Sequence, residues 1–354
     1  MAGGSAVISC GNATRCLEKE LSDFGITLEE EFLEAEKEMQ VAPMVWESLS
    51  EGPKKIMWAS KELGYQMELT PKFINSDHCI NCGLCVFGCI KNAKWTALNY
   101  LDQAIKNGAE VIYNTSVEHV IQENGKAIGI RGIGQNGKID YFADTVILSA
   151  GGLGTPIILQ KSGIKNSGSN FFTDLLINTY GITANLNQIN EPPMALIDRE
   201  FHASKGFILS TYVNAHRMVR FIELGSRGLT LPTNRLMGIM TKIADESVGY
   251  VKPDGTVSKP VTDRDWKRLK EGSSIAKEIL IKVGVDSHSI LFSKVQGAHP
   301  GGKAAIGKVV GKDLQTEIQN LYVCDASVFL TSPGMPPILT LCALAKNLAK
   351  KLAS

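Results

Sequence analysis

Hydrophobic and polar positions repeat with two different periods along the chain, and the change of period separates helices from strands. Residues 27–49 place Leu, Phe and Met at helical spacing, which predicts a helix that breaks at Pro43 and has a solvated acidic face. Residues 96–108 have the same period and end in Asn–Gly. Residues 109–132 alternate polar and apolar positions around a polar turn, which predicts two strands. The N-terminal half therefore runs from helix into sheet.

A strand-to-helix transition follows. Residues 145–150 are mainly apolar and predict a strand, a glycine-rich turn comes next, and an apolar helix ends at Gly163. A turn of this kind points backbone amides and a helix N-terminus at an anion. The segment favours a dinucleotide-type crossover, although AGGLG alone also fits a simple tight turn.

The remainder of the chain divides into two parts. From 167 to about 292, short apolar runs alternate with turns without a chemical motif, a pattern that resembles a substrate or cap domain. Residues 320–327 then predict a strand, and 331–353 predict an apolar helix whose start is set by Pro336 and Pro337.

Length and charge narrow the class of protein. A chain of 354 residues exceeds the ~100–200 of one domain, so two packed domains are expected. Thirty-seven basic and thirty-six acidic residues leave a charge of +1, which argues against nucleic acid as a partner. No apolar stretch approaches the ~18 residues of a membrane span, and the first residues lack signal-peptide character. We expect a cytoplasmic protein whose partners are small molecules or proteins.

Four of the eight cysteines crowd into one short segment with the spacing CxxCxxCxxxC: Cys79, Cys82, Cys85 and Cys89. This spacing brings thiolates around a compact centre and is typical of iron–sulfur ligation. Gly83 and Gly88 allow the tight wrapping that such a centre requires. The sequence therefore predicts a cluster, and with it electron transfer.

Zinc and reduced structural thiols remain alternatives for this segment. A zinc site normally pairs two CxxC elements across a longer loop, which this segment lacks. Ile90 stands where the bacterial ferredoxin run has proline, and the fourth cysteine of that run normally ligates a second cluster. Cys89 therefore either completes a 4Fe-4S cluster, leaves a 3Fe-4S cluster, or is replaced by a ligand from elsewhere.

Five segments, in this order, resemble the glucose–methanol–choline (GMC) flavoprotein oxidoreductases: residues 3–15, 82–96, 149–164, 298–302 and 320–348. The resemblance implies an α/β fold, in which an incomplete FAD-binding Rossmann-like domain carries an inserted antiparallel α+β substrate (cap) domain. The corresponding ranges are 1–166, with the cysteine segment at 76–96, then 167–292 and 293–354.

The resemblance also implies roles for individual residues. His299 matches the active-site histidine that handles the proton of the substrate hydroxyl while hydride moves to FAD. The family's second catalytic position, usually His or Asn, is Pro336 here, which has no titratable group. The implied FAD contacts are Gly3, Gly4, Ser5, Ser9, Val117, Ala150, Gly151, Asp325, Ala326, Pro337, Ile338 and Leu339.

Family members begin with a strand–GxGxxG–helix unit that binds the FAD pyrophosphate, and this sequence starts beyond it. We therefore expect either a fragment or a split enzyme whose companion chain supplies that unit.

The main functional hypothesis is a dehydrogenase that oxidises a hydroxyl-bearing substrate and passes electrons through the cluster to an acceptor protein such as a ferredoxin. The alternatives are a non-catalytic electron-transfer subunit for a flavin-bearing partner and a zinc-stabilised interaction protein.

Overall fold

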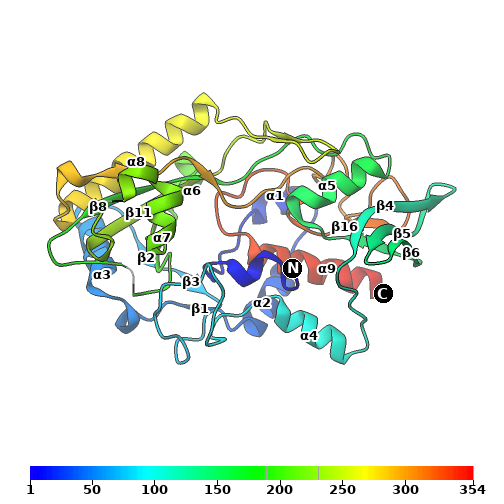
Figure 1. Ribbon diagram of the computed structural model, residues 1–354, viewed down its shortest axis with the longest axis horizontal. Helices are drawn as coiled ribbons and strands as arrows, with labels where there is room; N and C mark the ends of the chain where they lie inside the picture. The colour runs from blue at the N-terminus through cyan, green and yellow to red at the C-terminus, as the bar shows by residue number, and fades with distance from the viewer. Residues whose placement is uncertain (189, 230, 354) are drawn as a thin grey trace.

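The protein forms two lobes that lie side by side in a computed structural model, which describes residues 1–188, 190–229 and 231–353 (Figure 1). The sheet lobe is built on an antiparallel sheet. The crossover lobe is built on a parallel strand pair and an antiparallel three-stranded meander. The N-terminus and the end of helix α9 (Ile338–Ala353) lie in the crossover lobe.

The sheet lobe contains a seven-stranded sheet in the order β14-β8-β11-β10-β9-β2, with β15 also paired to β8. Its strands are β2 (Glu68–Leu69), β8 (Leu175–Ile182), β9 (Leu196–Asp198), β10 (Phe207–Thr211), β11 (Leu236–Ile243), β14 (Leu291–Phe292) and β15 (Gln296–Gly297). Helices α3 (Glu51–Glu62) and α8 (Asp263–Val283) contribute to the apolar core of this lobe, together with one face of the sheet. The lobe thus includes residues before 167, and the domain ranges stay a prediction.

The crossover lobe holds the parallel pair β7 (Val146–Leu148) and β16 (Leu321–Val323). Helix α5 (Gly151–Lys161) follows β7, and helix α9 (Ile338–Ala353) packs into the same core. Gly151 has a φ of 79° and Gly163 a φ of 98°, so glycines begin and end the helix. The meander consists of β4 (Ser116–Glu123), β5 (Lys126–Gly134) and β6 (Gly137–Phe142). The predicted strand-to-helix transition is confirmed.

Shorter elements complete the two lobes. The helices among them are α1 (Glu18–Asp23), α2 (Glu29–Glu38), α4 (Leu98–Lys106), α6 (Glu200–Lys205) and α7 (His216–Met218). Helix α2 packs on α9, and α6 packs on β10. The strands are β1 (Ala42–Pro43), which pairs with β3 (Pro71–Lys72), and β12 (Tyr250–Val251), which pairs with β13 (Val257–Ser258). No helix in the described part of the chain is long and apolar enough to cross a membrane.

The helix predicted over 27–49 is shorter than expected, because Gln40 adopts a left-handed φ of 52° after α2 ends. Its acidic face is not simply solvated, since Glu34 and Glu38 pair with Lys346 on α9. Helix α8 was not predicted, although Thr262 forms a capping box with Asp265 at its start.

Candidate active site

His299 lies two residues after the end of β15, in a loop that is held against the start of β8. The backbone amide of His299 donates to the Thr173 carbonyl at 2.8 Å. Its ring Nδ1 lies 2.8 Å from Oδ2 of Asp174. With Asp174 ionised, Nδ1 carries the hydrogen and Nε2 is left with a free lone pair. The ring is therefore oriented to accept a proton at Nε2.

Asp174 is itself held by several donors. It is fully buried and has a left-handed φ of 50°. Its Oδ1 accepts from Ser332 Oγ at 2.5 Å and from the Gly334 amide at 3.0 Å. Such a carboxylate cannot rotate away from His299 without losing these bonds.

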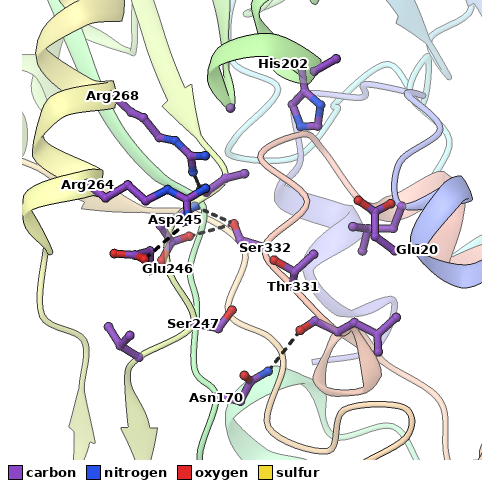
Figure 2. Close-up of a pocket in the computed structure, with 16 residues that line it drawn as sticks. Glu20, Asn170, His202, Asp245, Glu246, Ser247, Arg264, Arg268, Thr331 and Ser332 are labelled. Atoms are coloured by element: carbon purple, nitrogen blue, oxygen red, sulfur yellow. Dashed lines mark hydrogen bonds and ion pairs between the residues drawn. The ribbon is translucent and has the colours of Figure 1, made fainter. Parts of the chain in front are cut away.

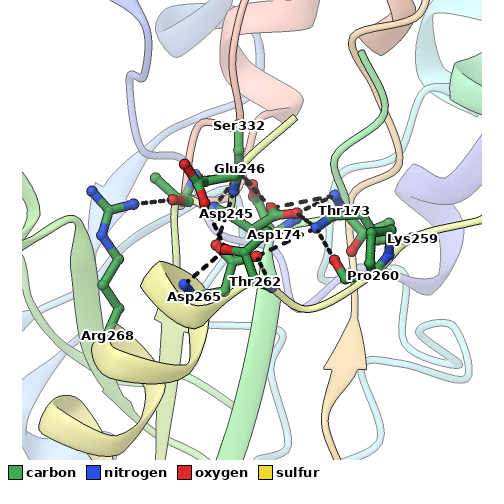
Figure 3. Close-up of polar contacts among 12 residues, drawn as sticks. Thr173, Asp174, Asp245, Glu246, Lys259, Pro260, Thr262, Asp265, Arg268 and Ser332 are labelled. Carbon is green, nitrogen blue, oxygen red and sulfur yellow. Dashed lines mark hydrogen bonds and ion pairs between the residues drawn. The ribbon is translucent and has the colours of Figure 1, made fainter. Parts of the chain in front are cut away.

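A second carboxylate, Asp245, extends the network (Figure 3). Its Oδ1 accepts from the Asp174 amide at 2.8 Å and lies 2.8 Å from Ser332 Oγ, whose single hydrogen it shares with Asp174. Lys259 balances its charge at 2.9 Å. Burial raises the pKa of Asp245, opposed by its hydrogen bond and ion pair with Lys259. Asp245 thus fixes the backbone and the serine that hold Asp174.

Burial lowers the pKa of His299 below its ordinary value of 6.5, and the nearby charge of Lys242 lowers it further, against the opposing effect of Asp174. The side chain remains 24% exposed. At neutral pH the imidazole is therefore neutral and accessible, as a general base must be.

The Asp174–His299 pair is joined to the segment that leads into α9, since the Gly334 amide bonds Asp174 and the helix begins at Ile338. The Pro336 carbonyl accepts from Thr14 Oγ1 at 3.0 Å, and Cys16 N donates to Thr340 Oγ1 at 3.0 Å. The N-terminal segment and the start of α9 are thus joined.

The implied FAD contacts are only partly brought together. Gly3, Ser5 and Ile338 line one cavity of about 530 Å³ between α9, α4 and the short helical segment Gly4–Ile8. Gly4 and Ser9 flank its N-terminal wall, and Pro337 directly precedes α9. Leu339 is fully buried.

A second group gathers at the carboxyl ends of β7 and β16. There the Gly151 amide donates to Asp325 Oδ2 at 2.9 Å, with Ala150 and Ala326 adjacent in sequence. Val117 lies on β4, packed against the core of the crossover lobe.

One stretch of the sequence has the glycine spacing of a dinucleotide-binding motif. Gly132, Gly134 and Gly137 follow the GxGxxG spacing, but they lie on the antiparallel hairpin of β5 and β6. Because no helix N-terminus follows, this turn is not a pyrophosphate site.

The four clustered cysteines line one small cavity, and Gly83 and Gly88 adopt positive φ beside it. Within the described ranges, however, no group of three or more His, Cys, Asp or Glu side chains is arranged to hold a metal ion. Burial raises the pKa of the Cys89 thiol, but backbone amides at Lys94, Lys91 and Ala93 outweigh it and lower the pKa overall. Thiols are the ligands that an iron–sulfur cluster requires, but these four side chains are not arranged as a metal site.

Lys94 joins the cysteine segment to the N-terminal loop. Its buried Nζ donates to the carbonyls of Cys85, Val7 and Ser9 at 2.8, 2.9 and 2.6 Å. The segment is therefore fixed beside the N-terminal residues 7–9.

Sequence reasoning missed Asp174, Asp245, Ser332 and Lys242. The available signal was weak: Asp174 directly precedes the apolar run of β8, and Ser332 lies inside the motif before α9. It also missed a polar cavity of about 570 Å³ lined by Arg264, Arg268 and His202, with Asp245 and Ser332 in its wall (Figure 2).

The fold is a mixed α/β fold of two lobes. Its candidate site is a histidine–carboxylate pair beside the antiparallel sheet, joined to the segment that precedes α9 in the crossover lobe. The family model for the N-terminal part of GMC oxidoreductases matches residues 3–188, and the C-terminal model matches 245–345. The chain belongs to the GMC oxidoreductase family.

Individual relatives agree with this assignment. An uncharacterized protein of Methanocaldococcus jannaschii is 31% identical over 99% of this chain and 86% of its own length. A long-chain-alcohol oxidase of Arabidopsis thaliana is 22% identical over 83% of this chain, which spans 49% of that enzyme. The structure of an Aspergillus oryzae formate oxidase, studied for modification of its FAD, superposes with a TM-score of 0.71 at 13% identity. The match covers 98% of this chain and 83% of that one. This last similarity shows the mixed α/β fold.

Proposed function

We propose that this protein is a GMC-type flavoprotein dehydrogenase that oxidises a hydroxyl-bearing substrate. The observation that carries the proposal is the Asp174–His299 pair, which is joined to the segment that leads into α9. A related enzyme is named for the oxidation of long-chain alcohols. A neutral, oriented histidine suits removal of a hydroxyl proton.

The chain's residues have separable tasks in this proposal. His299 Nε2 takes the hydroxyl proton, and Asp174 stabilises the imidazolium that forms. The first amides of α9, after Pro337, stabilise negative charge that develops nearby. FAD, when bound, supplies the acceptor for the hydride.

The cavity between α4 and α9 is the proposed FAD site, and its size and lining support this placement. Its volume of about 530 Å³ lies within the ordinary range of ligand sites. Trp95, Tyr100 and Leu341 provide apolar walls, and Ala345 leaves space. We also propose that a companion unit with a strand–GxGxxG–helix anchors the pyrophosphate, because GxGxxG at 132–137 occurs in a hairpin.

Electrons leave, in this proposal, through a 4Fe-4S or 3Fe-4S cluster on Cys79, Cys82, Cys85 and Cys89. Support comes from their shared cavity and from Lys94, which fixes them beside the N-terminal residues 7–9. Binding would require the thiols to close around the cluster. A one-electron exit favours a dehydrogenase over an oxidase.

An acceptor protein such as a ferredoxin would dock on this segment. Apolar side chains stand exposed around the cysteines: Ile80, Leu84, Phe87 and Ile90. Exposed apolar groups of this kind are typical of interaction sites. The cytoplasmic location remains a prediction.

The test uses anaerobically purified protein, loaded with FAD and with the companion unit if one is found. A panel of alcohols should bleach the oxidised-flavin absorbance. His299→Ala should slow this reduction by at least about 10²-fold, as for removal of a general base, whereas the exposed His288→Ala should match the wild type. Equal rates for His299→Ala and wild type would remove His299 from the site.

The second candidate is a non-catalytic electron-transfer subunit, favoured by Pro336 at the family's second catalytic position. It predicts a cluster that dithionite reduces, and no flavin reduction by any alcohol. Colourless protein that contains zinc would contradict both candidates.

A further inference from the structure

Lys242 lies on the face of the sheet that points toward the crossover lobe. It is on β11, opposite Leu176 of β8 and Ile208 of β10. Leu176, Ile208 and Met240 form an apolar cluster, against which Cys10 and Met335 of the crossover lobe pack. The lysine therefore stands in the interface between the two lobes, near the start of α9.

Lys242 differs from the other buried lysines in having no partner. Lys72 and Lys94 each donate to three protein oxygens, and Lys303 donates to the Gly152 carbonyl. Lys242 is 3% exposed and makes no hydrogen bond or ion pair with any residue that the structure describes. An ammonium that has no acceptor in the protein keeps its N–H groups free to donate to a group that binds there.

The ammonium is not sealed in the core. Some buried side-chain atoms in the described residues have neither a hydrogen-bond partner nor contact with solvent. Nζ of Lys242 is not one of them. The charged end of Lys242 therefore has some contact with solvent.

Lys242 lies within electrostatic reach of the histidine pair. Its charge contributes to the lowered pKa of His299. Burial lowers the pKa of Lys242 itself, while Asp174, Cys10 and Cys16 raise it. Asp174, at the start of β8, and Cys10, in the N-terminal segment, are thus both close enough to Lys242 to interact with its charge.

We propose that Lys242 is the second catalytic group of this site, donating a hydrogen bond to the substrate oxygen whose proton His299 removes. This rests on the proposed function, and it supplies the donor that Pro336 cannot provide.

The step balances without a further reactant. The substrate O–H bond breaks and its proton moves to His299 Nε2, while the oxygen keeps the electron pair. FAD, when bound, would accept the hydrogen of the substrate C–H bond together with its electron pair, which would leave a carbonyl. Lys242 keeps its proton throughout and stabilises the transient oxyanion.

The first experiment tests the position of Lys242 without substrate or flavin turnover. Histidine-labelled protein is titrated by NMR as wild type, Lys242→Met and Met240→Leu, with the six histidines assigned by substitution. Lys242→Met should raise the pKa of His299, because a neighbouring positive charge is removed. Met240→Leu, on the same face of the same strand, should leave it unchanged. An unchanged pKa in Lys242→Met would overturn the proposal.

The second experiment measures flavin reduction by an alcohol in the loaded protein. Lys242→Met should slow reduction by about 10²-fold, as for loss of one oxyanion donor, and Lys242→Arg should recover part of the rate. The acid limb of kcat/KM in Lys242→Met should move to higher pH. Wild-type rates in Lys242→Met would refute the catalytic role.

Failure of the proposed function can be distinguished from failure of the Lys242 proposal, because the wild-type protein itself would then reduce no flavin with any alcohol. In that case the NMR titration decides whether Lys242 faces His299.

Discussion

The orientation of the His299 ring depends on Asp174, whose own position is fixed by Ser332, Gly334 and the backbone beside Asp245. A neutral histidine with its Nδ1 hydrogen engaged has one free acceptor, Nε2. At the scale of single residues, buried partners thus determine both the tautomer of His299 and the orientation of its ring.

Asp174→Asn should lower the rate of flavin reduction by about 10²- to 10⁴-fold, because the amide neither fixes the tautomer nor stabilises the imidazolium. The pKa of His299 should fall further, since Asp174 raises it. Stopped-flow reduction and NMR titration check both effects. Asp198→Asn, a buried carboxylate elsewhere in the sheet, is the matched control, and an unaltered rate in Asp174→Asn would contradict the assignment.

The pH dependence follows from the lowered pKa of His299. A base must be neutral, so activity is present above this pKa and is lost as the pH falls through it. The acid limb of kcat/KM should therefore lie below pH 6.5, the ordinary value. A pH profile at constant ionic strength measures it, and a limb above 6.5 would show that another group controls the step.

At the scale of elements, α5 positions the His299 loop by close backbone contact. A Cβ added at Gly152 would lie 1.9 Å from the Pro300 carbonyl oxygen. Because that atom belongs to backbone, it cannot move aside without shifting the residue that follows His299.

Gly152→Ala should therefore lower the free energy of unfolding by about 1–3 kcal/mol, the usual cost of overpacking. It should also displace His299 and slow flavin reduction. Gly154→Ala, in the same helix, meets only Ala150 Cβ at 3.0 Å and should cost less. Denaturant unfolding compares the two variants, and equal stabilities would argue against the tight contact.

Helices α2 and α9 show a different kind of interaction between elements. Lys346 and Lys350 of α9 pair with Glu34, Glu38 and Glu31 of α2. Exposed pairs of this kind contribute little individually. They nevertheless explain why the acidic run does not form a free solvated face.

At the scale of the whole molecule, the cavity beside α9 joins residues from the start, middle and end of the chain. Gly3, Trp95 and Ala345 line it together. The cysteine segment is fixed to the same N-terminal loop through Lys94. The two proposed redox centres would therefore be neighbours.

Ala345→Trp should fill this cavity and reduce FAD retention at least about tenfold, since an indole excludes the cofactor from a site of that size. Ala345 is exposed, so folding should be preserved. Flavin absorbance per protein measures retention, and circular dichroism checks the fold. Ala353→Trp, exposed on the same helix but outside the cavity lining, is the control. Undiminished flavin in Ala345→Trp would place FAD elsewhere.

Local patterns in the sequence were sufficient for the strand and helix around Gly151 and for the start of α9 after Pro337, because both depend on backbone chemistry within a few neighbouring positions. The spacing of the cysteines predicts a cluster, and this stays a prediction. His299 was proposed from the resemblance to a family, since a single histidine before Pro–Gly–Gly has no local signal of its own. The missed helix α8 also had local signals, in its capping box and in Gly284 at its end.

The partners of His299 could not be found in this way. Asp174 lies 125 positions from His299, and Ser332 lies 158 from Asp174. Lys242 is one lysine within an apolar strand, and only the strand register places it on the face toward the crossover lobe. Hydrogen bonds and electrostatic effects depend on distance in space, so tertiary structure alone decided which polar residues act together.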